Sequence, residues 1–475
     1  PLVIWQTGSG TQSNMNVNEV IANRCHVIKG NKLGEGERLV HPNDDVNKSQ
    51  SSNDTFPTGM HIAAYTKIIE TTIPGVEKLR DTLKTKSEAF KDVVKIGRTH
   101  LMDAMPVTLG QELDGWRAQI DSASARLGDS MGRLTALAQG GTAVGTGINA
   151  HPRFARLFAQ HLSRRTGLRF VTSPNAFESL SSQDTAAEVS GQLRVLSGAM
   201  MKIANDLRWM NSGPLAGLGE IELPTLQPGS SIMPGKVNPV IPEAVCMVAA
   251  RVYGNDATIA LAAQSGSFQL NTMLPLIAHD LLQSIALLGQ AARLLADRAI
   301  QGFSVKSAHI AQTLARNPVL ITAANAELGY EKGAAIAKRR VPSAELVARI
   351  GLCHGGGAIG HLIARQQRQP VRAFQHRGIQ PQIARDRGRA FRDIRQVFLV
   401  RPFMHQRVRD QDDPPLVQQR GDAGGPDLDA GVKDVVDQFQ HLRRFSRGPG
   451  DHPSGSDLRR LARQFLAGPD TGQRI

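Results

Sequence analysis

The sequence predicts an all-α protein whose core is a bundle of long helices. Three stretches, 109–137, 189–210 and 274–295, place an apolar residue at every third or fourth position along their whole length. Such a stripe is typical of an amphipathic helix, and a sustained repeat near 3.5 residues favours helices that pack nearly parallel. No competing alternation of period two predicts strands. The simplest interpretation of the stripes is that they form the core.

Changes in composition and Gly/Pro-rich loops divide the chain into four parts. Residues 1–53 are polar and rich in Asn, Ser, Thr and Gly, which predicts loops and short helices in a partial N-terminal domain. We expect this domain to be truncated at its start, since Pro1 lies within a motif. Residues 54–301 form the predicted helix bundle, which Gly/Pro-rich loops interrupt at 139–152 and 211–239. The pattern of residues 302–339 predicts a shorter helical segment, which would be a partial C-terminal domain.

The composition changes abruptly in the fourth part, residues 340–475. Residues 1–340 hold 34 Lys and Arg against 28 Asp and Glu, whereas 341–475 hold 22 against 14. All but one of those 22 cations are Arg, and the only Glu is Glu345. Two interpretations compete: a tail of out-of-frame or foreign sequence, and a basic disordered extension. A nucleic-acid module is a third, which the scattered arginines and few aromatic residues disfavour.

Several protein classes are excluded by what the sequence lacks. The chain is 41% hydrophobic and 21% charged, which is typical of a globular protein, and no apolar run is long enough for a transmembrane helix. Its three cysteines are far apart, which excludes a disulfide scaffold and fits a reducing compartment. The motifs of ATP-binding loops, dinucleotide-binding loops and zinc proteases are also missing. His26, His41 and His100 have no metal-like spacing.

Four polar segments are candidates for chemistry, namely residues 5–20, 41–58, 97–103 and 229–239. They concentrate hydroxyl and amide side chains, which orient carboxylates, and the last segment adds Lys236. They therefore suit a small anionic substrate, although each can also be an ordinary loop. His100 and Glu243 form a plausible proton-transfer unit, whereas a lone histidine is more often structural.

These segments carry a family resemblance that covers residues 1–339. The sequence GSSIMPGKVNP, residues 229–239, resembles the signature loop of the fumarase/aspartase superfamily. The other three segments resemble the conserved regions of class II fumarase. His100 stands where aspartases usually carry Gln, and Gly235 where they tend to carry Ala. The resemblance implies the fumarase/aspartase-like helix bundle and a lyase of the tricarboxylic acid cycle.

The implied reaction is the reversible hydration of fumarate to L-malate by anti addition of water, without a metal or an organic cofactor. In the dehydration direction Ser230 would take the C3 proton, with Lys236 stabilising negative charge. His100, oriented by Glu243, would protonate the leaving hydroxide through a water molecule. The resemblance implies these substrate-binding residues: Ser9, Gly10, Thr11, Ser51, Ser52, Asn53, Thr99, Ser231 and Asn238. It also implies a second anion site, for which a structural role is an equal alternative: His41, Pro42, Asn43 and Asp44.

The resemblance further implies a homotetramer whose active sites are shared between subunits. We expect a dicarboxylate substrate, no specific nucleic acid partner and no membrane. The expected location is the cytoplasm, or the mitochondrial matrix if the source is eukaryotic. Two alternatives stay open: an aspartate ammonia-lyase, and a truncated or frameshifted relative without activity.

Overall fold

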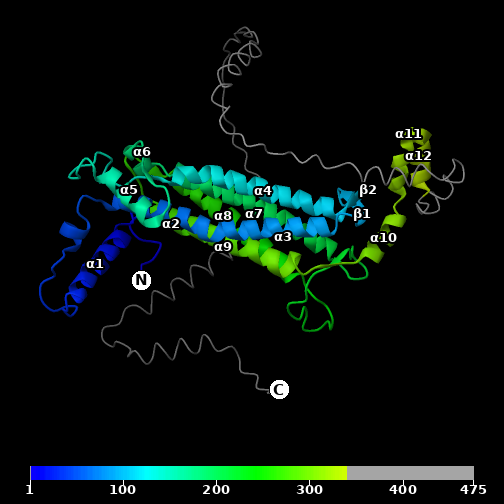
Figure 1. Ribbon diagram of the computed structural model, residues 1–475, viewed down its shortest axis with the longest axis horizontal. Helices are drawn as coiled ribbons and strands as arrows, with labels where there is room; N and C mark the ends of the chain where they lie inside the picture. The colour runs from blue at the N-terminus through cyan, green and yellow to red at the C-terminus, as the bar shows by residue number, and fades with distance from the viewer. Residues whose placement is uncertain (1, 340–475) are drawn as a thin grey trace, which may run out of the picture. The chain divides into compact units, whose positions relative to one another are not determined.

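The computed structural model describes residues 2–339, so the predictions for the tail at 340–475 lie outside the described residues. A bundle of long helices forms the core, as predicted (Figure 1). Its members are α2 (Ser52–Lys67), α3 (Ile73–Ala89), α4 (Leu109–Leu134), α7 (Asp184–Met210), α8 (Val240–Ala263) and α9 (Leu274–Leu294). A π-helical turn, Ile68–Thr72, joins α2 to α3, and another, Leu295–Ile300, extends α9.

The predicted stripes are buried in one continuous apolar core. Leu113 and Ile120 on α4, Leu193 on α7 and Leu281 on α9 have no exposed surface. Burial of such side chains stabilises the fold by about 1.5–3 kcal/mol each. The all-α, long-helix fold class is therefore confirmed. None of the helices within residues 2–339 is long and apolar enough to cross a membrane.

The expectation that no strands would form was wrong, because the described residues contain one β-hairpin with long strands and three pairs of two-residue strands. Strands β1 (Val94–Thr99) and β2 (Met102–Thr108) pair antiparallel, with Thr99 opposite Met102. His100 and Leu101 form the two-residue turn, at φ of 56° and 60°. Two-residue hairpin turns usually contain Asn-Gly or Asp-Gly, and neither pair is present here. A register shift between Ile96 and Arg98 further obscures the alternation.

The prediction of only loops and short helices in residues 1–53 was also wrong, because α1 (Thr11–Ile28) has 18 residues. This helix is polar and packs partly through amide side chains. Asn14 and Asn18 are buried, and their Nδ2 atoms donate to Asn47 Oδ1 at 3.0 and 3.1 Å. A search for apolar stripes cannot detect such a helix.

Smaller elements cap the two ends of the bundle. Helices α5 (Phe154–Thr166) and α6 (Ala176–Ser181) follow α4, and the chain continues after α9 into α10 (Ser307–Ala315), a 3₁₀ helix (Pro318–Ala324), α11 (Asn325–Leu328) and α12 (Tyr330–Lys338). Two-residue strands pair as β3 (Ala136–Leu137) with β4 (Val171–Thr172), β5 (Ile221–Glu222) with β8 (Ser304–Val305), and β6 (Gly266–Ser267) with β7 (Leu270–Asn271). The pair β5–β8 joins the loop after α7 to the segment before α10.

Candidate active site

The predicted site residues fall into two groups at opposite ends of the bundle. The α2-end group is Ser9, Gly10, Thr11, Ser51, Ser52 and Asn53. The hairpin-end group is Thr99, His100, Ser230, Ser231, Lys236, Asn238 and Glu243. Helix α7 runs between the two ends, and its 27 residues span about 40 Å at 1.5 Å per residue. The two groups therefore cannot meet within one chain.

The α2-end group is held together by close packing and hydrogen bonds. Gly10 begins α1 at φ 75°, and a Cβ there would lie 2.1 Å from the Phe56 ring on α2, so only glycine fits. Asn14 on α1 donates to Ser52 Oγ at 3.0 Å. The Ser9 and Thr11 hydroxyls are 2.6 Å apart. Two predicted segments thus converge on the start of α2.

Asp54 is a residue that the sequence analysis missed at this end. Ser51 caps α2 by accepting from Asn53 N, while Ser51 N donates to Asp54 Oδ1 at 2.9 Å. The other carboxylate oxygen accepts from the amides of Gly140 and Thr142 at 2.9 and 2.8 Å. The spacing of Ser51 and Asp54, a capping box, was the available signal. This carboxylate fixes the start of α2 to the loop after α4.

At the other end, Thr99 and His100 occupy the exposed tip of the hairpin. Residues other than glycine seldom adopt a positive φ, so the backbone of the turn at His100 and Leu101 is strained. Among residues 2–339, no side chain forms a hydrogen bond or ion pair with the His100 imidazole. The ring is presented to solvent, where a group from outside this chain can reach it.

The signature loop folds around the Ser230 hydroxyl. The amides of Ile232 and Met233 donate to Ser230 Oγ at 3.3 and 3.0 Å. Asn238 Nδ2 closes the loop by donating to Gly229 O at 2.8 Å. Two backbone donors therefore point at the oxygen that the family resemblance implies as the base.

A cleft of about 850 Å³ lies between this loop, the end of α7 and the start of α8. Lys236, Asn238 and Glu243 line it together with two further cations, Arg208 and Lys306. Glu222 also lines the cleft and pairs with Lys306 at 3.4 Å, so among the described residues the cations there without a carboxylate partner are Lys236 and Arg208, which can face an anionic ligand. Neither Ser230 nor His100 is among its lining residues. Among residues 2–339, no hydrogen bond or ion pair joins His100 to Glu243.

Comparison with known proteins identifies the family. The family described as lyase matches residues 1–254. A fumarate hydratase class II of Pseudomonas aeruginosa is 56% identical over 339 residues, which cover 71% of this chain and 72% of that protein. The chain belongs to the class II fumarate hydratase family. A Bacillus subtilis member is 50% identical over 338 residues, covering 71% of this chain and 73% of its own.

A solved class II fumarase shares the fold of this fumarate hydratase family member. The crystal structure of the Schistosoma mansoni enzyme has a TM-score of 0.71 and 37% identity, and covers 74% of this chain and 77% of its own. The long-helix bundle described above is therefore the architecture of the fumarate hydratase family.

The four residues predicted as a second anion site form a π-helical turn, Pro42–Val46, which His41 caps. His41 Nδ1 accepts from Asp44 N at 3.1 Å and lies 3.3 Å from the Asp44 carboxylate. Pro42 is buried and Asn43 is exposed. These contacts stabilise the turn, which favours a structural role for these residues over an anion site. Within residues 2–339 no cluster of three or more His, Cys, Asp or Glu residues could hold a metal ion.

Proposed function

We propose that this member of the class II fumarate hydratase family catalyses the reversible hydration of fumarate to L-malate, with Ser230 and His100 transferring the two protons. Homologues named fumarate hydratase support the reaction. His100 in the hairpin and Gly235 in the signature loop support hydration over ammonia addition. The bacterial sources of these homologues support a cytoplasmic location.

The observation that carries this proposal is the pair of amides at Ser230. A serine is a weak base unless its alkoxide is stabilised. The N–H groups of Ile232 and Met233 already donate to Ser230 Oγ, and they would hold an alkoxide as an oxyanion hole does. In dehydration, Ser230 would take the C3 proton of malate while negative charge builds on the adjacent carboxylate.

The cations and amides of the two groups would bind the substrate. Lys236 in the cleft would neutralise the carboxylate that gains charge, and the Asn238 amide would help to hold it. Ser51, Ser52 and Asn53 would orient it, helped by Ser9, Gly10, Thr11, Thr99 and Ser231. Hydroxyl and amide donors fix the position of a dianion, which brings the reacting carbon into line with the base.

His100 would act as the general acid through a bound water molecule. Protonation of the leaving hydroxide balances the proton that Ser230 removes, so the two steps together release water and form the double bond. Glu243 would orient the imidazole. Because one chain does not join these two residues, the Glu243 carboxylate would come from a neighbouring chain.

The distribution of site residues supports an oligomer with shared sites, for which the family resemblance implies four subunits. The two groups lie about 40 Å apart along α7, so a complete site needs more than one chain. Large apolar side chains are exposed beside the hairpin-end residues. Leu101 next to His100 is 63% exposed, and Ile232 in the signature loop is 83% exposed. Exposed apolar surface of this kind fits burial against other subunits.

A spectroscopic assay tests the reaction. The chain is incubated with fumarate in ammonia-free buffer, and the loss of the ultraviolet absorbance of fumarate is followed, with malate identified as the product. Turnover that requires ammonium and yields aspartate would instead establish an ammonia-lyase. A folded chain without either activity would establish the inactive alternative.

A further inference from the structure

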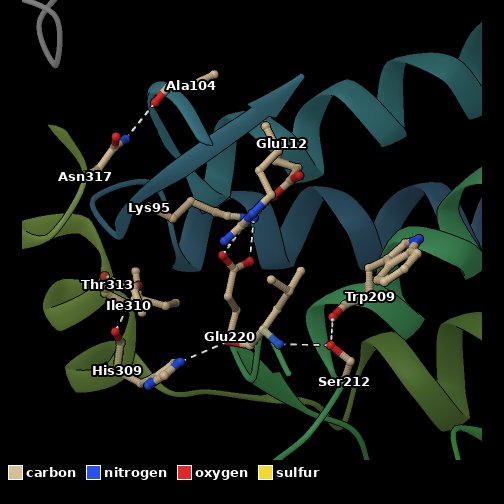
Figure 2. Close-up of polar contacts among 12 residues, drawn as sticks. Lys95, Ala104, Glu112, Trp209, Ser212, Glu220, His309, Ile310, Thr313 and Asn317 are labelled. Atoms are coloured by element: carbon tan, nitrogen blue, oxygen red, sulfur yellow. Dashed lines mark hydrogen bonds and ion pairs between the residues drawn. The ribbon is translucent and has the colours of Figure 1, made fainter. Parts of the chain in front are cut away.

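Glu220 is a buried residue whose carboxylate lies between two cations of β1. The residue is 2% exposed. Its amide donates to Met210 O at the end of α7 at 2.8 Å, and its carbonyl accepts from Lys306 N at 2.9 Å. One carboxylate oxygen lies 2.6 Å from the Arg98 guanidinium. The other lies 2.7 Å from Lys95 Nζ, and Figure 2 labels Lys95 beside Glu220.

The two cations belong to the hairpin that carries His100. Lys95 and Arg98 are both on β1, whose last residue precedes His100. Glu220 belongs to the loop between α7 and α8, in which Ser230 follows ten residues later. The carboxylate therefore joins the segment that presents the proposed acid to the segment that presents the proposed base.

Residues of α10 and of the 3₁₀ helix make a second set of contacts with the same two segments. His309 on α10 lies with Nε2 2.9 Å from Leu218 O, two residues before Glu220. Asn317, which caps the 3₁₀ helix, donates to Ala104 O on β2 at 2.9 Å. Figure 2 labels His309, Asn317 and Ala104 in the same view as Glu220. The hairpin and the loop are thus fixed to each other directly, and also through the segment that contains α10 and the 3₁₀ helix.

The cluster is electrically balanced, because Glu112 on α4 also contacts Lys95, at 2.6 Å. Two cations face two carboxylates. The desolvation of buried charges offsets much of their attraction, so a buried ion pair contributes little to net stability. What such a pair provides is a defined geometry, since both partners must stay in place to remain neutralised.

We propose that Glu220 is a positioning residue for the hydration reaction, whose carboxylate fixes the His100 hairpin relative to the Ser230 loop. This inference rests on the proposed function. Both segments point toward the same end of the bundle, where each would complete a site with neighbouring chains. A displacement of one relative to the other would move a proton-transfer group out of line, and errors of about 1 Å can cost about 100-fold in rate.

A double-mutant cycle on the full chain tests the inference, with Glu220→Gln and His100→Asn as the two changes. Glu220→Gln should lower kcat roughly 10- to 100-fold and change KM little. If Glu220 acts through His100, the same change in the His100→Asn background should lower kcat by about twofold at most. An equal loss in both backgrounds would overturn the proposal, because it would show a general structural effect.

Glu112→Gln is the matched control, since it removes a carboxylate from the same lysine. Glu112 tethers β1 to α4, which follows the hairpin directly in the chain, so its loss should not separate hairpin from loop. We expect kcat to change by about threefold at most. A Glu112→Gln effect as large as that of Glu220→Gln would contradict a specific role of Glu220. If Glu220→Gln fails to fold, Arg98→Lys gives a milder test, with an intermediate loss of kcat expected and wild-type kcat contradicting the proposal.

Amide hydrogen exchange separates a failure of this inference from a failure of the proposed function. Exchange should accelerate in residues 97–104 and 211–222 of Glu220→Gln, but not of Glu112→Gln, whether or not the chain turns over fumarate. Unchanged exchange in both segments would overturn the link between them. Absence of fumarate turnover by the wild-type chain would instead refute the proposed function.

Discussion

The two ends of the bundle carry candidate site residues of different character. At the α2 end these residues are tied to their surroundings: Ser51 caps α2, and Asn53 Nδ2 donates to Ala143 O at 2.8 Å. At the hairpin end, His100 and Lys236 are exposed, and no side-chain partner within residues 2–339 engages either one. A single chain thus holds the α2-end residues through its own contacts, and leaves His100 and Lys236 at the hairpin end without a side-chain partner among the described residues.

The largest effect should come from the hairpin end, at Ser230. Ser230→Ala removes the oxygen to which two loop amides donate, so we expect nearly complete loss of turnover. Thermal unfolding should stay unchanged, since Ser230 lies in a loop outside the apolar core. Steady-state rates and unfolding curves measure both. Full activity in this variant would refute the role of Ser230 as the base.

His100→Asn should produce the next largest loss, roughly 10²- to 10⁴-fold in kcat, the usual contribution of one general acid–base group. Asparagine tolerates the left-handed φ of the turn, so the hairpin should keep its shape. Steady-state rates measure the loss, and wild-type kcat in this variant would remove His100 from the mechanism.

A change at the α2 end should act on binding instead of chemistry. Gly10→Ala combines an unfavourable φ with a clash against Phe56, and should destabilise the junction of α1 with α2 by about 1–3 kcal/mol. We expect a raised KM for fumarate with a smaller change in kcat. Gly30→Ala is the control, since Gly30 has φ 89° but open space around it. Equal effects of the two substitutions would show that the Phe56 contact is unimportant.

The smallest expected effect concerns stability near the same end, at His61 on α2. Burial lowers the pKa of His61, whose Nδ1 lies 3.2 Å from Ala136 O. Its contribution to stability is full above the ordinary pKa of about 6.5, and is lost as pH falls toward the lowered value.

Denaturant unfolding of the wild type, His61→Gln and the exposed control His161→Gln, at about pH 7.5 and about pH 5.5, measures this term. The free energy of unfolding should fall less on acidification in His61→Gln than in the other two proteins. The same pH dependence in all three would exclude His61 as the cause.

Sequence reasoning found the features that packing imposes and missed those that depend on local polar contacts. The stripes through Leu113 and Leu193 were visible because burial demands apolar residues at helical spacing. Helix α1 was missed because Asn14 and Asn18 anchor it through amides. The turn at His100 was missed because its positive φ comes without the usual glycine.

The site residues themselves were recognisable from their segments, but their grouping was not. The path of the chain decides that Ser52 and His100 lie at opposite ends of the bundle, and no local pattern encodes a separation along α7. The contact between the Asp54 carboxylate and the loop after α4 could not be predicted from the sequence either. The partners of this carboxylate, Gly140 and Thr142, are more than eighty residues away in the sequence.

Subunit complementation tests most directly the central claim, that a complete site combines the two ends from different chains. Asn53→Ala and Ser230→Ala chains, each expected to be nearly inactive, are co-expressed in equal amounts and the mixed oligomers assayed. Random assembly should restore both groups in about a quarter of the sites. The pair Lys236→Ala and Ser230→Ala should recover nothing, because both residues belong to one loop. Recovery of activity only in the first mixture is the predicted result, and no recovery in verified mixed oligomers would contradict the account.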